Sequence, residues 1–126
     1  MMMGEMEVVA TSVQDEFRIV FEHAGVGMAF TGLDDLFIRV NRKYAEMLGY
    51  SVEEMRGLGP DQVTADEHRA ARQERKRLLL TGARRELTFE KQLVRKDGSL
   101  IWVSIVTSLI RGANGEPRYF LSVVQD

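Results

Sequence analysis

The chain has 126 residues, a length that suits one domain with a single hydrophobic core. Apolar residues make up 44% of it and charged residues 29%, with a formal net charge of −2, which argues against an intrinsically disordered chain. The absence of cysteine excludes disulfides, thiolate metal ligands and cysteinyl cofactor adducts. No apolar run approaches the ~18 residues that span a bilayer, so we expect no membrane contact by this segment and a cytoplasmic location.

The first predicted element is a helix over residues 12–24, which follows a flexible segment over residues 1–11. Ser12 stands where a helix cap is expected. The apolar residues behind it recur at the spacing of one helical face, and they are Val13, Phe17, Val20, Phe21 and Ala24. This apolar face is wider than light contact with one surface would need.

Two strands are predicted next, over residues 26–31 and 36–40, with a turn between them. Asn41 can then cap a short helix, which continues through Leu48. Gly49 is expected to end this helix, because glycine readily adopts the left-handed conformation that follows a last helical turn.

Two more helix starts have the spacing of a capping box, Ser51-Val-Glu-Glu54 and Thr64-Ala-Asp-Glu67. The second is predicted to open a long helix that runs to about Thr81. Basic residues concentrate in residues 69–85, at a spacing that fits a helix with one solvated face. No aromatic residues are interleaved there for base stacking, so we do not expect nucleic-acid binding.

Three strands complete the predicted elements, over residues 86–94, 99–110 and 117–124. The turn Asp97-Gly98 joins the first two as a tight hairpin, since it supplies residues that tolerate positive φ. Hairpins imply antiparallel pairing. The sequence therefore predicts an α+β domain with a five-stranded antiparallel sheet that carries helices on one face.

Four segments of the chain, in this order, together resemble the PAS family of sensory domains: FEHAGVGMAFT, VNRKYAEMLGYSVEEMRG, RKDGSLIWV and NGEPRYFLSVVQD. The resemblance implies one PAS domain over residues 12–126, with a flanking helix over residues 12–24 and a core over residues 26–126. It also implies the PAS fold, with a small-molecule cavity between the sheet and its helices. The fold by itself does not determine what is sensed.

PAS domains usually act as input or interaction modules of signalling proteins. The resemblance implies a sensory module of a multidomain signal-transduction protein, above all a sensor histidine kinase of a two-component system, that senses a small ligand or relays a signal by dimer rearrangement. The alternative is a ligand-free dimerisation domain of a diguanylate cyclase or transcription regulator. No serine, histidine and acid follow a known catalytic arrangement, so we expect that this domain is not an enzyme.

The residues that could line the cavity come from strands and helices alike. In the strand over residues 99–110, alternation separates Val103 and Ile105 from Trp102, and the resemblance turns the first two toward the cavity. The full set is Met28, Phe30, Ile38, Tyr44, Met47, Leu48, Leu58, Val63, Leu78, Leu87, Phe89, Val103, Ile105, Thr107, Ser122 and Val124. With so few polar groups, a bound ligand would be small and apolar or aromatic. The same residues could instead form a filled core without any ligand.

Two cofactors occur in similar domains, and neither is expected here. Light-oxygen-voltage domains place an adduct-forming cysteine where this chain has Pro60, and a flavin-contacting glutamine where it has Val124. Haem-binding relatives ligate iron from the long helix, where His68 lies, but their ligand position falls near Ala71. The acids around His68 are explained by the start of a helix, so no metal site is predicted.

A homodimer is expected by resemblance, because the flanking helix of related domains packs on the outer face of the sheet and against its counterpart. The candidate interface residues are Val13, Phe17, Val20, Phe21, Ala24 and Trp102. The ending Val-Val-Gln-Asp resembles the start of the family's exit motif. Asp126 would then mark where a signal leaves toward a C-terminal effector domain.

Overall fold

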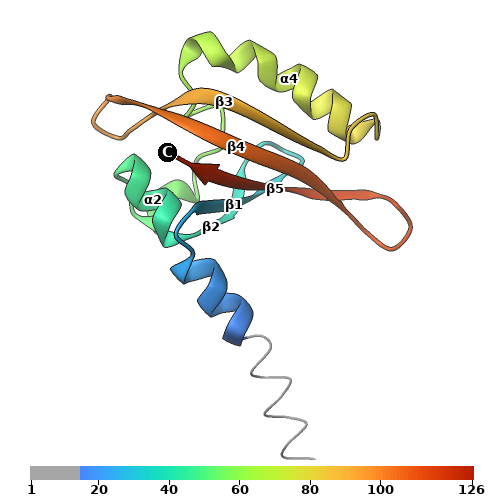
Figure 1. Ribbon diagram of the computed structural model, residues 1–126, viewed down its shortest axis with the longest axis horizontal. Helices are drawn as coiled ribbons and strands as arrows, with labels where there is room; N and C mark the ends of the chain where they lie inside the picture. Colours follow the sequence, from blue (N-terminus) through green and yellow to red (C-terminus); the bar gives the residue numbers. More distant parts are fainter. Residues whose placement is uncertain (1–14) are drawn as a thin grey trace, which may run out of the picture.

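The computed structural model describes residues 15–126 and contains a five-stranded sheet in the order β2-β1-β5-β4-β3 (Figure 1). All neighbouring strands pair antiparallel. The strands are β1 (Gly27–Gly32), β2 (Phe37–Val40), β3 (Glu86–Val94), β4 (Leu100–Arg111) and β5 (Pro117–Gln125). The predicted α+β class and the antiparallel sheet are therefore confirmed. The predicted flexible segment over residues 1–11 lies outside the described residues.

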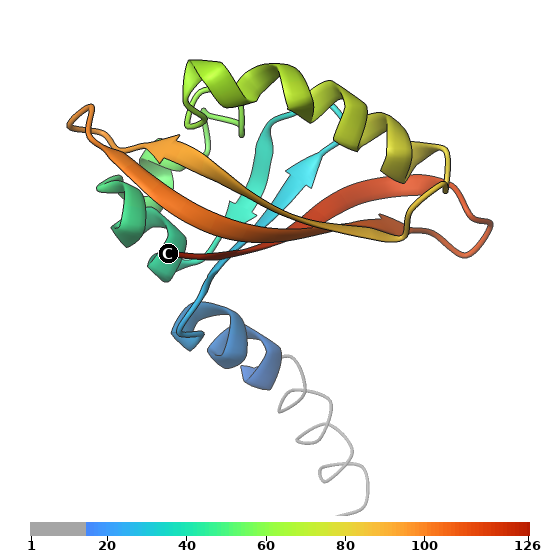
Figure 2. The ribbon, with the colours of Figure 1, turned by 45° about the horizontal axis from the view of Figure 1, so that its top comes forward.

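Three helices follow β2 along the chain, α2 (Arg42–Leu48), α3 (Val52–Met55) and α4 (Asp66–Leu80). A further helix, described over residues 15–23, precedes β1 and is called the N-terminal helix below. Figures 1 and 2 show α4 on one side of the sheet and the N-terminal helix on the other. The predicted flanking helix is confirmed over its described part.

Local capping explains the two short helices. The Asn41 side chain accepts a hydrogen bond from the Tyr44 backbone N–H at 3.0 Å, and Gly49 ends α2 with φ of 79°. Ser51 and Glu54 form both bonds of a capping box at the start of α3. Each of these hydrogen bonds satisfies a backbone donor that the helix geometry leaves without a partner.

The second capping box, predicted at Thr64, is wrong. Ala65 occupies the cap position of α4 and makes no side-chain cap bond. The backbone at Thr64 is held by the edge strand instead, since Thr64 bridges to Leu93 and the Ala65 N–H donates to the Gln92 carbonyl at 3.0 Å. The Thr64 hydroxyl donates to the Pro60 carbonyl at 2.6 Å, so it is not available to the helix.

A β-bulge interrupts the regular alternation of inward and outward side chains where β2 pairs with β1. Phe37 opposes Thr31 and Arg39 opposes Phe30, so Ile38 is an extra residue between the two pairs. Ile38 is 57% exposed, and the buried position belongs to Phe37. The inward orientation predicted for Ile38 is therefore wrong.

The predicted orientation of the β1 side chains is also wrong. Other parts of the chain cover both faces of this strand, so apolar side chains lie on each of them. Phe30 lies on the outer face, where its ring stacks on Phe21 of the N-terminal helix with centroids 5.6 Å apart. Ala29 and Thr31, rather than Met28 and Phe30, point to the helix-covered side. Alternating hydrophobicity marks one face of a strand, but it gives no direction when both faces are covered.

The main core lies between the sheet and the helices α2 and α3. Its most deeply buried side chains include Leu48, Met55 and Leu93, and burial of each stabilises the fold by about 1.5–3 kcal/mol. Phe89 and Ile105 oppose each other on β3 and β4 and both pack in this core, as predicted. A smaller core cluster joins the end of α4 to the sheet.

Candidate functional site

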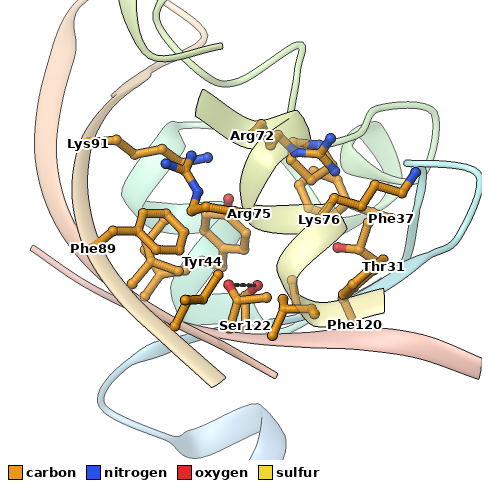
Figure 3. A pocket seen from close by; sticks show the side chains of 17 residues that line it. Thr31, Phe37, Tyr44, Arg72, Arg75, Lys76, Phe89, Lys91, Phe120 and Ser122 are labelled. Atoms are coloured by element: carbon orange, nitrogen blue, oxygen red, sulfur yellow. Dashed lines mark hydrogen bonds between the residues drawn. The ribbon is translucent and has the colours of Figure 1, made fainter. Parts of the chain in front are cut away.

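A cavity of about 60 Å³ lies between α4 and the inner face of the sheet (Figure 3). Residues from all five strands or their ends, from α2 and from α4 contribute to it. The lining residues are Ala29, Thr31, Phe37, Tyr44, Pro60, Arg72, Arg75, Lys76, Leu79, Leu87, Phe89, Lys91, Ile105, Thr107, Phe120, Ser122 and Val124.

The structure brings seven of the predicted pocket residues to this cavity, and they are Tyr44, Leu87, Phe89, Ile105, Thr107, Ser122 and Val124. Four others are buried in the main core instead: Met47, Leu48, Val63 and Val103. Leu58 packs against that core, and Leu78 packs against the smaller cluster while its neighbour Leu79 faces the cavity. Met28, Phe30 and Ile38 point elsewhere, as described above. Contact of any of these residues with a ligand stays a prediction.

Four basic residues line the cavity, and none of them was predicted to do so. Arg72, Arg75 and Lys76 come from one face of α4, and Lys91 comes from β3. The interpretation of residues 69–85 as a solvated helix face is therefore wrong for these three helical residues. One signal was present in the sequence, because Lys91 continues the inward alternation of Leu87 and Phe89.

Asp35 pairs with two of these bases from the rim of the cavity. Its carboxylate accepts hydrogen bonds from Arg72 and Lys76, each at 3.0 Å. Burial raises the pKa of Asp35, but the bonds from Lys76 and Arg72 outweigh it and hold this pKa below its usual value. The Asp35 carbonyl touches Gly59, where a Cβ would have no room. Gly59 thus allows the Asp35 loop to approach α4.

Among the residues that the structure describes, Arg75 and Lys91 have no such acidic partner. The Arg75 guanidinium lies over the Phe89 ring at 3.8 Å from its centroid, and the Lys91 ammonium lies 5.8 Å from the same centroid. Lys91 is 4% exposed and donates to the Thr64 hydroxyl at 2.9 Å. Burial, and then the nearby charges of Arg75 and Arg72, lower the pKa of Lys91 to about 7.

Hydroxyl groups form another part of the cavity wall. Thr107 and Ser122 oppose each other on β4 and β5, and their side-chain oxygens are 2.9 Å apart in a hydrogen bond. Figure 3 shows Ser122 apart from Lys91. Burial raises the pKa of Tyr44, so its phenol stays protonated and can donate a hydrogen bond.

Pro60 and Val124 both line the cavity. Neither provides a thiol or an amide. His68 is not among the lining residues, and its ring packs edge-on against Trp102 with centroids 5.3 Å apart. Within residues 15–126 no group of three or more histidine and acidic side chains could hold a metal ion.

The outer side of the sheet carries exposed apolar side chains. Phe17 and Val20 of the N-terminal helix are 52% and 65% exposed, and Trp102 on β4 is 57% exposed. Ile19, which was not predicted, is also exposed. Phe21 is buried within its own chain, so its assignment to a dimer interface is wrong. Ala24 is half-buried, and Val13 lies outside the described residues.

Asn41 connects the N-terminal helix to the rest of the domain. Its side-chain amide donates to the carbonyls of Phe21 and Val26 at 2.9 and 3.0 Å, and its oxygen accepts from the N–H groups of Met28 and Tyr44. The side chain is fully buried, so these four bonds saturate a polar group that has no access to water.

These features occur together in a known family, and a family model described as PAS fold matches residues 37–124. This chain belongs to the PAS family. A solved PAS domain of an HTR-like protein from Haloarcula marismortui has a TM-score of 0.77 at 21% identity, with 98% of each chain covered. That likeness extends to the N-terminal helix and shows the shared fold.

Two curated relatives contain a similar PAS domain within much longer chains. One is a probable diguanylate cyclase of Escherichia coli, 30% identical over 90% of this chain and 10% of its own length. The other is the sensor histidine kinase TmoS of Ectopseudomonas mendocina, 23% identical over 97% of this chain and 12% of its own. The PAS domain described here thus spans about a tenth of the length of these relatives. Within its described residues, no helix has the length and apolar character needed to cross a membrane.

Proposed function

We propose that this PAS domain is the sensory input module of a multidomain signalling protein, and that it binds a small ligand in the cavity beneath α4. The two relatives support a histidine kinase or a diguanylate cyclase as the output. In this proposal the output domain lies C-terminal to Asp126. The domain itself senses and does not catalyse. We place the assembly in the cytoplasm.

The main support for ligand sensing is that basic side chains line the cavity. A cavity without a function is usually apolar, and buried charges are normally paired or coordinated. Within residues 15–126, Arg75 and Lys91 have no carboxylate partner, and one guanidinium nitrogen of Arg75 is buried without any hydrogen bond. This arrangement favours a bound small molecule over a ligand-free scaffold, for which an apolar filling would be more stable.

The ligand is neither a flavin nor a haem in this proposal. A cavity of about 60 Å³ is far smaller than the ~300–1,000 Å³ of pockets that enclose drug-sized ligands, and both cofactors are at least that large. Pro60 and Val124 replace the two residues that light-oxygen-voltage domains use for flavin chemistry. His68 packs against Trp102 rather than lining the cavity.

Native mass spectrometry of the freshly purified chain, together with its absorption spectrum, tests this function. We expect the mass of a small molecule on the protein, or uptake of one from a metabolite library, and no visible absorption band. Ser122→Phe should abolish binding because it fills the cavity, whereas Val123→Phe on the neighbouring position should retain it. A chain that takes up no small molecule would contradict ligand sensing.

A homodimer is the second part of the proposal. Phe17 and Val20 are neighbours on one face of the N-terminal helix, and their exposure supports a partner there. Trp102 offers a further apolar contact on the same side of the sheet. Through Asn41, a movement of the N-terminal helix would reach β1, which gives the dimer a route to relay a signal.

A further inference from the structure

We propose that the ligand of the cavity is a small organic carboxylate, whose carboxylate group binds between Arg75 and Lys91. This inference rests on the proposed sensory function and specifies the chemical class of what is sensed. It replaces the apolar or aromatic ligand that the sequence suggested.

The first argument for an anionic ligand is the balance of charge in the cavity wall. Four lining residues are basic, and the seventeen described lining residues include no aspartate or glutamate. Asp35 approaches from the rim and pairs with Arg72 and Lys76, and Asp61 also pairs with Arg72, so two carboxylates balance these two bases. The remaining positive charge belongs to Arg75 and Lys91, and both lie over the ring of Phe89. The electrostatic potential at this end of the cavity therefore favours an anion.

The second argument is that α4 carries buried donors without a hydrogen-bond partner. One guanidinium nitrogen of Arg75 is buried and has no hydrogen-bond partner, and the same holds for one nitrogen of Arg72. Asp61 lies 3.5 Å from Arg72 without completing a hydrogen bond to that nitrogen. A buried donor without an acceptor is strongly destabilising, so an incoming carboxylate would supply acceptors that the chain lacks.

Size and polarity narrow the ligand to a carboxylate with a short carbon skeleton. The volume of about 60 Å³ is far below the ~300–1,000 Å³ of pockets for drug-sized ligands, so it favours a small molecule. Beyond the basic end the wall is mostly apolar, with Leu79, Leu87 and Ile105 among its residues. The Thr107 and Ser122 hydroxyls could bind a second polar atom of the ligand. Inorganic phosphate has a similar size but would leave this apolar surface without a matching partner.

Protonation of Lys91 should be coupled to binding. The groups that act on its ammonium are Arg75 and Arg72 from α4, Asp61 from the loop before α4, and the Thr64 hydroxyl. Two of these repel the ammonium, and Asp61 alone attracts it. A bound carboxylate would add attraction, so the domain should take up a proton with the ligand near neutral pH.

Isothermal titration calorimetry of the full chain tests the proposal with defined probes. Sodium propionate and sodium butyrate are the carboxylate probes, propionamide is the uncharged probe of matched size, and sodium phosphate is the inorganic anion. We expect saturable binding of at least one carboxylate, at least about tenfold weaker binding of propionamide, and weaker binding of phosphate. Carboxylate affinity should fall as the pH rises from 6 to 9.

Variants locate the site. Arg75→Gln and Lys91→Met should each weaken carboxylate binding at least about tenfold at pH 6. Arg77→Gln is the matched control, because Arg77 lies on the exposed side of α4 in an ion pair with Glu74, and it should bind as the parent does. Thermal melts of all variants check that each one is folded.

Three results would contradict the proposal that the ligand is a carboxylate. They are equal affinity for propionamide and propionate, binding of phosphate alone, and unchanged affinity in a folded Arg75→Gln variant. If a neutral molecule fills the cavity in native mass spectrometry, sensing stands and the anionic class is wrong. If neither the probes nor a metabolite library give any complex, the sensory function fails as well.

Discussion

Lys91 is the side chain in which burial and charge conflict most directly. It projects from β3 into the cavity, where the Thr64 hydroxyl accepts a hydrogen bond from it. Burial first, and then Arg75 and Arg72, lower its pKa from 10.5 to about 7. In the folded chain this lysine therefore gains or loses its proton close to neutral pH.

Substitution Lys91→Met should remove a pH-dependent destabilisation. Between pH 7 and 10.5 the unfolded chain holds a proton that the folded chain has released, so the free energy of unfolding of the parent rises with pH. The shift corresponds to a difference on the order of 5 kcal/mol, present below pH 7 and absent above pH 10.5. Urea unfolding at several pH values should find the methionine variant more stable than the parent at pH 6, with the gain shrinking toward pH 10.

The matched control is Lys96→Met, which removes an exposed lysine that pairs with Glu54 at the surface. Exposed ion pairs contribute little to stability, so its difference from the parent should stay small and nearly independent of pH. A parent and a Lys91→Met variant whose difference does not change with pH would contradict the lowered pKa.

At the scale of elements, Asn41 joins three of them. It caps α2, receives the N–H of β1, and holds the last turn of the N-terminal helix through the Phe21 carbonyl. The attachment of the N-terminal helix therefore depends on the side chain of Asn41, which follows β2. The stacking of Phe21 on Phe30 is the second contact that holds it.

Asn41→Asp should loosen the N-terminal helix selectively. A carboxylate can still accept from Met28 and Tyr44, but it cannot donate to the carbonyls of Phe21 and Val26. Each acceptor left unsatisfied should destabilise the attachment by about 1–3 kcal/mol. Hydrogen exchange measured by mass spectrometry should be faster in the variant than in the parent over residues 15–23. The exchange of α4 should change less.

Asn114→Asp, in the exposed loop before β5, provides the control and should exchange as the parent does. Unchanged protection of residues 15–23 in the Asn41 variant would mean that aromatic stacking alone attaches the helix.

Helices with local signals could be predicted from the sequence, because a capping residue acts on backbone groups only a few positions away. Asn41, Gly49 and Ser51 are examples. Thr64 has the same local pattern, yet pairing with Leu93 on a distant strand decides its conformation. Long-range pairing of this kind leaves no mark within a short window of sequence.

The candidate site was less predictable for a similar reason. The β3 and β4 residues Phe89 and Ile105 follow plain alternation and were placed correctly. The bulge at Ile38 shifts the alternation by one residue. The basic residues of α4 look like a solvated face in the sequence, and only the position of Asp35 at the rim explains how Arg72 can turn inward.

At the scale of the whole molecule, the two sides of the sheet differ in kind. One side carries the cavity and α4, and the other carries the N-terminal helix with exposed Phe17 and Val20. Single exposed apolar side chains are common on protein surfaces, whereas neighbouring ones on a helix indicate a contact surface.

The double substitution Phe17→Glu, Val20→Glu should convert a dimeric parent into a folded monomer. Two carboxylates on this face would repel their copies across the interface and remove its apolar contact. Light scattering over a concentration series measures the change. Arg18→Glu, an exposed change on the same helix, is the control for charge alone. A parent that stays monomeric at high micromolar concentration excludes the dimer for this chain, and a folded double variant that still dimerises places the interface elsewhere.

The pairing of Gly27 with Val124 also has a mechanical consequence. The start of β1 and the end of β5 are adjacent. A force that pulls these two ends apart therefore breaks the hydrogen-bonded pairs between the strands one after another, beginning at this end. Val124 also lines the cavity, and the first pair to open would break the cavity wall. We expect a pulling experiment with handles at residues 26 and 125 to record stepwise opening at low force. A single rupture at high force would contradict this.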